Sequence, residues 1–220
     1  LSDAIEALVE FTRHRRPQAR REAYMALSAI DDPRVPSLLT IGLADADGSV
    51  RGATALALGE IGARQASQEL FRAFDLGVAE AAVAIGQLAD EAGAERFSSY
   101  LGKRSLAVML SGYEHLLRRD DISEQSKLAL VAALGELSGQ MFSEATAASG
   151  SGRSEAEVNA PAAASPGEGH KQERAPGRQI ELFLQGYLAS GGAKGQEALE
   201  RSVRATILRI RRRRAVEADD

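Results

Sequence analysis

The sequence has no cysteine and no tryptophan among its 220 residues, and aromatic residues make up 5% of it. Without cysteine the chain has neither a disulfide framework nor a thiol nucleophile, and this fits a reducing compartment. No apolar run approaches the ~18–20 residues with which a helix spans a bilayer. We therefore expect a cytoplasmic protein without a transmembrane segment. The chain begins at Leu1 and not at Met, as a fragment or a processed chain does.

Residue patterns that carry chemistry are also missing. His14, His115 and His170 are far apart, and none has a metal-ligating companion at helical spacing. The Asp pairs that begin at Asp31 and Asp120 fall between expected helices, where aspartate caps helix ends. The sequence shows no phosphate loop and no nucleophile elbow. We predict no catalytic residue, no cofactor and no metal site, and we expect a protein that is not an enzyme.

Charge is distributed unevenly along the chain. Residues 171–220 carry a net charge of +4, and the rest of the chain carries −8. An acidic body disfavours nucleic-acid binding by that part. The most basic stretch is the basic patch, Arg211, Arg212, Arg213 and Arg214. These side chains suit phosphates or an acidic surface, but four arginines also complement the dipole at a helix C-terminus, and we favour this second interpretation.

One helix pattern dominates the sequence, at residues 48–61. Its apolar positions recur at i, i+4, i+7, i+8 and i+11, which is one face of an α-helix. Asp47-Gly48-Ser49 supplies a cap before it, and Gly62 stands where a helix stop is expected. We therefore predict a tightly packed helix over this range.

Degraded copies of this helix recur along the chain. Ala57-Leu58-Gly59-Glu60-Ile61 aligns with similar pentapeptides that begin at Ala26, Ala84 and Ala133. Helical units repeated at such spacing are typical of α-solenoids. The predicted inner helices are 17–30, 48–61, 77–88 and 122–138. We expect outer helices at 33–43 and 65–74, and a three-helix, armadillo-like unit at 91–138.

The repeated unit resembles HEAT repeats, in particular the short bacterial type first noted in phycobilisome lyases. The resemblance is carried by Asp32-Pro33-Arg34-Val35-Pro36-Ser37-Leu38-Leu39 and by the stretch from Asp45 to Gly62. It is clear over 17–89, weaker to 138 and absent beyond. It implies an all-α fold, and we predict a right-handed α-solenoid.

The resemblance also implies a ladder between stacked repeats, in which an Asp and an Arg stand six positions apart. The candidate ladder residues are Arg20, Asp45, Arg51, Asp121 and Lys127. His14 replaces the Asp of the first copy, and the third copy has Arg72 and Val78 at the two positions. We expect these charges to be structural and the ladder to be interrupted in the middle.

The chain is predicted to have three parts. Residues 1–138 form the solenoid. Residues 139–178, which are rich in Ala, Gly, Ser, Pro and Glu, read as a disordered or loose linker. Residues 179–220 carry two amphipathic helices, at 180–188 and 196–214.

Three of the four predicted inner helices have small or apolar residues opposite their buried stripes, which implies that both sides are covered. Tight curvature can let neighbouring inner helices cover one another. Alternatively, a groove there receives a helix, either from a partner protein or from the chain's own 196–214 segment. The groove residues on this second interpretation are Tyr24, Gly52, Ala55, Ala79, Ala82, Leu128 and Val131.

These observations favour a non-enzymatic scaffold or adaptor that binds another protein in the bacterial cytoplasm. Two alternatives belong to other classes. One is a lyase-type or chaperone-like subunit that acts on a partner protein. The other is a nucleic-acid-associated protein that uses the basic C-terminal helix.

Overall fold

The structure is a computed structural model that describes residues 2–150 and 176–219. These residues form eleven α-helices and one short 3-10 helix, and no strand is found among them. The predicted all-α class is therefore confirmed. The chain divides into two compact units, Leu1–Ser126 and Lys127–Asp220, which are described separately below.

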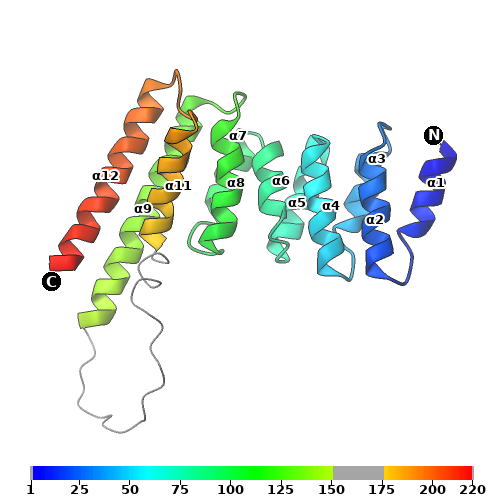
Figure 1. Ribbon diagram of the computed structural model, residues 1–220, viewed down its shortest axis with the longest axis horizontal. Helices are drawn as coiled ribbons and strands as arrows, with labels where there is room; N and C mark the ends of the chain where they lie inside the picture. Colours follow the sequence, from blue (N-terminus) through cyan, green and yellow to red (C-terminus); the bar gives the residue numbers. More distant parts are fainter. Residues whose placement is uncertain (1, 151–175, 220) are drawn as a thin grey trace, which may run out of the picture. The chain divides into compact units, whose positions relative to one another are not determined.

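The first unit is an α-solenoid of four helix pairs. Its helices stand side by side in a row (Figure 1). The inner layer consists of α2 (Pro17–Ser28), α4 (Gly48–Glu60), α6 (Ala81–Leu88) and α8 (Leu106–Arg118), and each of them packs on the next. The other members of the pairs are α1 (Ser2–Phe11), α3 (Val35–Gly42), α5 (Ser67–Asp75) and α7 (Glu91–Ser98), with the 3-10 helix η1 (Arg64–Ala66) before α5.

Local sequence explains where α4 begins and ends. The Asp47 carboxylate accepts hydrogen bonds from the backbone N of Ser49 at 2.9 Å and from its hydroxyl at 2.6 Å, which caps the helix. After the helix, Gly62 has a φ of 71°, a conformation that glycine adopts without strain. The predicted range of 48–61 is thus correct to within one residue. The third inner helix starts later than predicted, at Ala81, because Gly77 has a φ of 92° and belongs to the preceding turn.

The fourth inner helix is α8 and not residues 122–138, so the predicted three-helix unit at 91–138 is wrong. α7 contacts α8 through side chains, with Tyr113 donating from its hydroxyl to Ser98 Oγ at 2.9 Å, and α8 packs on α6. Gly112 allows the close approach, since a Cβ added there would lie 2.6 Å from the carbonyl oxygen of Ala82. Large side chains such as Met109 and Tyr113 fill the buried face of α8, and they hide its relation to the alanine-rich copies.

The second unit consists of most of α9 (Glu124–Gly150) with α11 (Pro176–Ala189) and α12 (Glu197–Asp219). α11 packs on α12, and Thr206 of α12 faces Gly135 of α9. The buried faces include Ile180, Leu184 and Tyr187 on α11 and Leu199, Val203, Ile207 and Ile210 on α12, whereas Phe183 and Leu188 on α11 are half-buried.

The predicted boundaries at 138, 139 and 178 differ from those observed. The division between units falls after Ser126, so that most of the predicted helix 122–138 lies in the second unit. α9 continues to Gly150, because residues 141–149 contain neither Gly nor Pro and include several good helix formers. α11 begins at Pro176. The remainder of the predicted linker, 151–175, lies outside the described residues.

Candidate protein-interaction surfaces

The predicted inner groove is closed. Tyr24 is 4% exposed, Ala55 and Ala82 are fully buried, and Gly52 is buried as well. A Cβ added to Gly52 would lie 2.6 Å from the Glu80 carboxylate carbon, which shows how near the next repeat comes. The groove prediction is therefore wrong for these residues, and mutual coverage of neighbouring inner helices explains their small size.

The other predicted groove residues do not complete such a site. Ala79 is exposed in the turn before α6. Leu128 is half-buried and Val131 is fully buried, and both belong to the second unit. The stripe of the 196–214 segment, which was a candidate occupant of the groove, is part of the core of that second unit.

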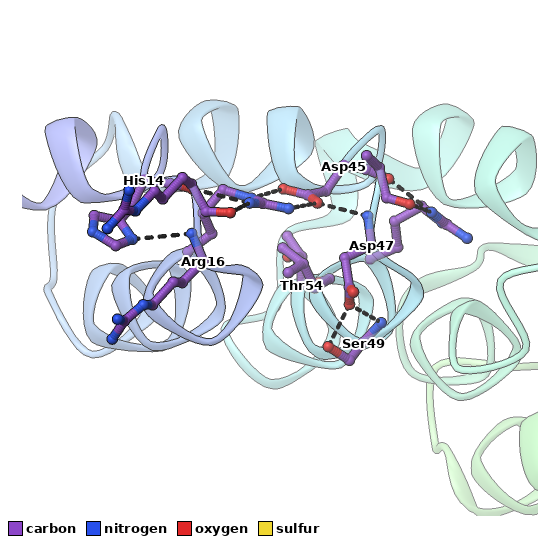
Figure 2. A network of polar contacts seen from close by, with 11 residues as sticks. His14, Arg16, Asp45, Asp47, Ser49 and Thr54 are labelled. Atoms are coloured by element: carbon purple, nitrogen blue, oxygen red, sulfur yellow. Dashed lines mark hydrogen bonds and ion pairs between the residues drawn. The ribbon is translucent and has the colours of Figure 1, made fainter.

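The first rung of the predicted ladder is present and joins the first two repeats (Figure 2). Arg20 donates from Nε to Asp45 Oδ2 at 2.7 Å and from Nη2 to Asp45 Oδ1 at 2.6 Å. Its Nη1 also donates to the carbonyl oxygen of His14 at 2.9 Å. The hydrogen bond from Arg20 holds the pKa of Asp45 below its usual value. Such a bidentate pair fixes one repeat against the next.

The second rung lacks its acid, as the sequence predicted. Arg51 repeats the geometry of Arg20 and donates from Nη1 to the carbonyl oxygens of Asp45 at 2.7 Å and Ala46 at 3.0 Å. The aligned position in the next copy is Arg72, whose cation lies 3.9 Å from Glu69 in its own helix. This position therefore supplies no carboxylate for Arg51.

Asp121 takes part in a different contact from the one expected. Arg64 lies 2.6 Å and Arg119 2.8 Å from its carboxylate. The hydrogen bond from Arg119 is the main reason that the pKa of Asp121 is lowered. Arg119 also donates to the carbonyl oxygen of Ala89 at 2.6 Å, just beyond the C-terminus of α6. Lys127, the other half of the predicted pair, is 1% exposed and belongs to the second unit.

Half of the basic patch is used inside the second unit. Arg211 Nε and Arg214 Nη1 each donate to the carboxylate of Glu181 at 2.8 Å, and Arg178 lies 3.2 Å from it. Burial alone would raise the pKa of Glu181, but the hydrogen bonds from Arg211 and Arg178 outweigh it and the pKa is lowered. Sequence analysis missed Glu181. The available signal was an acid three positions before Leu184, on the apolar face of its helix.

An open apolar groove lies elsewhere in the first unit, between α1 and α3. It has a volume of about 830 Å³, and its apolar lining includes Ile5, Val9, Leu38 and Ile41. Ile41 is 64% exposed, although most large apolar side chains of these repeats are buried. Glu6 and Glu10 line the α1 side and Arg34 the α3 side. This groove was not predicted from the sequence, because apolar residues at helical spacing do not show which of them another element covers.

A smaller hollow of about 120 Å³ continues this groove toward the loop that joins α1 and α2. Val9, Leu38 and Ile41 line both spaces, and the smaller one also reaches Arg13 and Tyr24. We call the two spaces together the trough. An occupant of the trough therefore meets apolar side chains along its length and a guanidinium at one end.

Two properties of the described residues bear on other classes of function. No group of three or more His, Asp or Glu side chains is placed there to hold a metal ion. Within the same residues, no helix has both the length and the apolar character that crossing a membrane requires.

Comparisons with known proteins agree with the repeated architecture. No curated protein matches the chain. Among solved structures, the crystal structure of an engineered protein from the Northeast Structural Genomics Consortium aligns with 95% of this chain and 97% of its own, at 14% identity. Its TM-score of 0.28 is too low to support an argument. A family model described as HEAT repeats matches residues 2–59, which span α1 to α4. This part of the chain is therefore similar to HEAT repeats.

Proposed function

We propose that this protein is a non-enzymatic scaffold or adaptor, and that a partner protein docks in the trough. HEAT repeats generally mediate contacts between proteins, and stacked helical repeats form extended binding surfaces. The observation that carries the proposal is the apolar trough itself, since open apolar surface bordered by charge marks interaction sites.

The occupant that suits the trough is an amphipathic helix. Ile5 and Val9 lie one turn apart on α1, and Leu38 and Ile41 lie one turn apart on α3. Two such ridges accept the i, i+3 and i+4 side chains of a third helix. α1 has ten residues and is about 15 Å long, enough for three turns of a partner.

Charge at the rim indicates the polar edge of that helix. Glu6 and Glu10 lie one turn apart on the α1 side. Arg34 on the other side is already bound by Asp32, at 2.9 Å. Glu10 on the α1 rim therefore favours a lysine or arginine at the corresponding position of the partner.

Ile41→Lys tests this site, with Leu76→Lys as its matched control. Both residues are large, apolar and exposed, at 64% and 82%, but Leu76 does not line the trough. Neither change should alter helicity or the melting temperature. Burial of an isoleucine side chain contributes about 1.5–3 kcal/mol, so Ile41→Lys should weaken partner binding about tenfold to a hundredfold.

The measurement compares the proteins that the wild type, Ile41→Lys and Leu76→Lys each capture from a cell lysate. Proteins retained by the wild type and by Leu76→Lys, but lost by Ile41→Lys, are the partners of the trough, and their affinities can then be measured with purified protein. Equal capture by all three forms would place docking elsewhere. Failure of the wild type to retain any protein specifically would count against the scaffold function itself.

The nucleic-acid alternative receives less support than it had from sequence alone. Arg211 and Arg214, two of the four arginines that suggested it, are bound by Glu181. No observation in the described residues favours the lyase-type or chaperone-like alternative over a plain scaffold.

A further inference from the structure

The loop between α1 and α2 and the start of α2 concentrate positive charge in an otherwise acidic unit. Residues 13–21 contain five arginines and one histidine and no acidic residue, whereas residues 1–126 as a whole have 14 basic and 19 acidic residues. Four of these arginines have exposed side chains. We call them the arginine cluster: Arg13, Arg15, Arg16 and Arg21.

The backbone that carries the cluster is held in place. The carbonyl oxygens of His14 and Arg15 accept hydrogen bonds from Arg20 at 2.9 and 3.3 Å. The backbone N of Arg16 donates to Nδ1 of His14 at 3.1 Å (Figure 2). These contacts hold the backbone of the loop, which lowers the entropy cost of ordering it when a ligand binds.

The positive charge of the cluster is also not matched by ion pairs among the described residues. Arg20 lies beside it, but its cation is matched by Asp45. No ion pair within the part of the chain that the structure describes includes a member of the cluster. Four adjacent cations without a matching acid suit a ligand with several carboxylates, because guanidinium groups bind carboxylates in a bidentate manner.

We propose that the arginine cluster binds an acidic segment of the partner protein, directly after the helix that occupies the trough. This inference rests on the proposed function and specifies its partner. Arg13 joins the two features, since it lines the end of the trough together with Val9 and Leu38. A helix seated on the apolar lining brings its next residues to Arg13 and its neighbours.

A protein ligand fits this surface better than a nucleic acid. Glu10 and Glu22 flank the cluster in the sequence and are exposed. A duplex would extend beyond one loop, and its phosphates would meet the excess of acids in the unit. Tight duplex binding commonly uses about 6–10 phosphate contacts, and the cluster has four arginines. A short acidic peptide needs no wider surface.

The test uses the full chain and two probes, fluorescent poly-L-glutamate and a 20-base-pair DNA duplex, in anisotropy titrations at two salt concentrations. The cluster variant combines Arg13→Gln, Arg15→Gln and Arg16→Gln. The control variant combines Arg72→Gln, Lys103→Gln and Arg118→Gln, which removes the same charge from exposed positions of the same unit. Circular dichroism verifies that both variants are folded.

We expect the wild type and the control to bind polyglutamate equally, with affinity that falls as salt rises. The cluster variant should bind at least tenfold more weakly, and the duplex should bind more weakly than polyglutamate. Equal binding by the cluster variant would overturn the proposal. Tighter binding of the duplex, lost in the cluster variant, would overturn it in favour of a nucleic-acid ligand.

Ile41→Lys separates this inference from the proposed function. It should keep the affinity for polyglutamate, because its side chain belongs to the trough and not to the cluster. Retained polyglutamate binding together with unchanged partner capture by Ile41→Lys would contradict the trough as the docking site but not the cluster. Loss of partner capture in Ile41→Lys, with no effect of the cluster variant on polyglutamate, would contradict the cluster alone.

Discussion

A close approach between two inner helices leads to a specific prediction at Gly112. In Gly112→Ala the new Cβ would lie 2.6 Å from the carbonyl oxygen of Ala82 and 2.6 Å from Cζ of Phe97. Ordinary contacts between such atoms are about 3.5–4.0 Å long, so α6 or α8 has to move by about 1 Å. Phe97 is fully buried and has little freedom to turn away.

Two effects of opposite sign compete in this variant. Replacement of an interior helical glycine by alanine stabilises a helix by about 1 kcal/mol. Overpacking of a core costs about 1–3 kcal/mol, and here the upper end applies because one of the two obstacles is backbone. The net expectation is a loss of about 1–2 kcal/mol in the free energy of unfolding.

Gly186→Ala is the control for the propensity effect. Gly186 lies inside α11, and a Cβ added there meets nothing within 4 Å. This variant should gain about 0.5–1 kcal/mol. Urea titrations followed by circular dichroism give the overall stability, and hydrogen exchange of α6 and α8 locates the change. If Gly112→Ala is as stable as the wild type, the two helices are not in the contact that this structure gives them.

Three further variants test the ladder, the second unit and the inner face. Asp45→Asn removes the acid bound by Arg20; because the pKa of Asp45 is lowered in the folded state, the wild type should be more stable at neutral pH. This difference should shrink as the pH falls below the ordinary value of about 3.9 and vanish below the folded-state pKa, as urea titrations across pH would show. Glu181→Gln should cost about 1–3 kcal/mol, less than a fully buried pair because its arginines reach water. Exposed Glu200→Gln, which breaks only an i,i+4 pair with one arginine, should cost under about 0.5 kcal/mol; equal losses in the two variants would show that the Glu181 cluster adds nothing. Ala55→Arg should unfold the first unit, since Ala55 is fully buried. If circular dichroism shows that this variant is folded, the inner groove that the sequence predicted would be supported again.

Sequence alone predicted the elements that short-range patterns determine. The cap at Asp47, the stop at Gly62 and the apolar stripe between them determine α4 within its own residues. The same pattern copied along the chain identified α2 and α6. The family resemblance identified Arg20 and Asp45 as ladder residues, because both stand at fixed positions of the repeat, but it did not pair them with each other.

Features that depend on packing were not predictable in this way. α8 has the interior glycine but not the alanine-rich sequence of its neighbours, so Gly112 was not recognised as the contact with α6. Apolar residues at period 3.6 show that a helix has a covered face, but they do not show what covers it. For that reason the small residues of α4 were compatible with a groove, and Ile41 was compatible with a core.

The location of the open surface follows from the same packing. The glycines and alanines of the inner helices let neighbouring repeats approach until residues such as Gly52 and Ala55 are buried, which leaves no room for a ligand between them. α1 and α3 carry larger side chains on their facing sides. The groove between these two helices remains open, and Ile41 is one of the residues that line it. Close inner packing supports the repeats, and the function proposed above places recognition on the outer helices and on the loop that Arg20 holds. Substitutions on the inner face should therefore change stability before binding, and those at Ile41 or in the arginine cluster should change binding before stability.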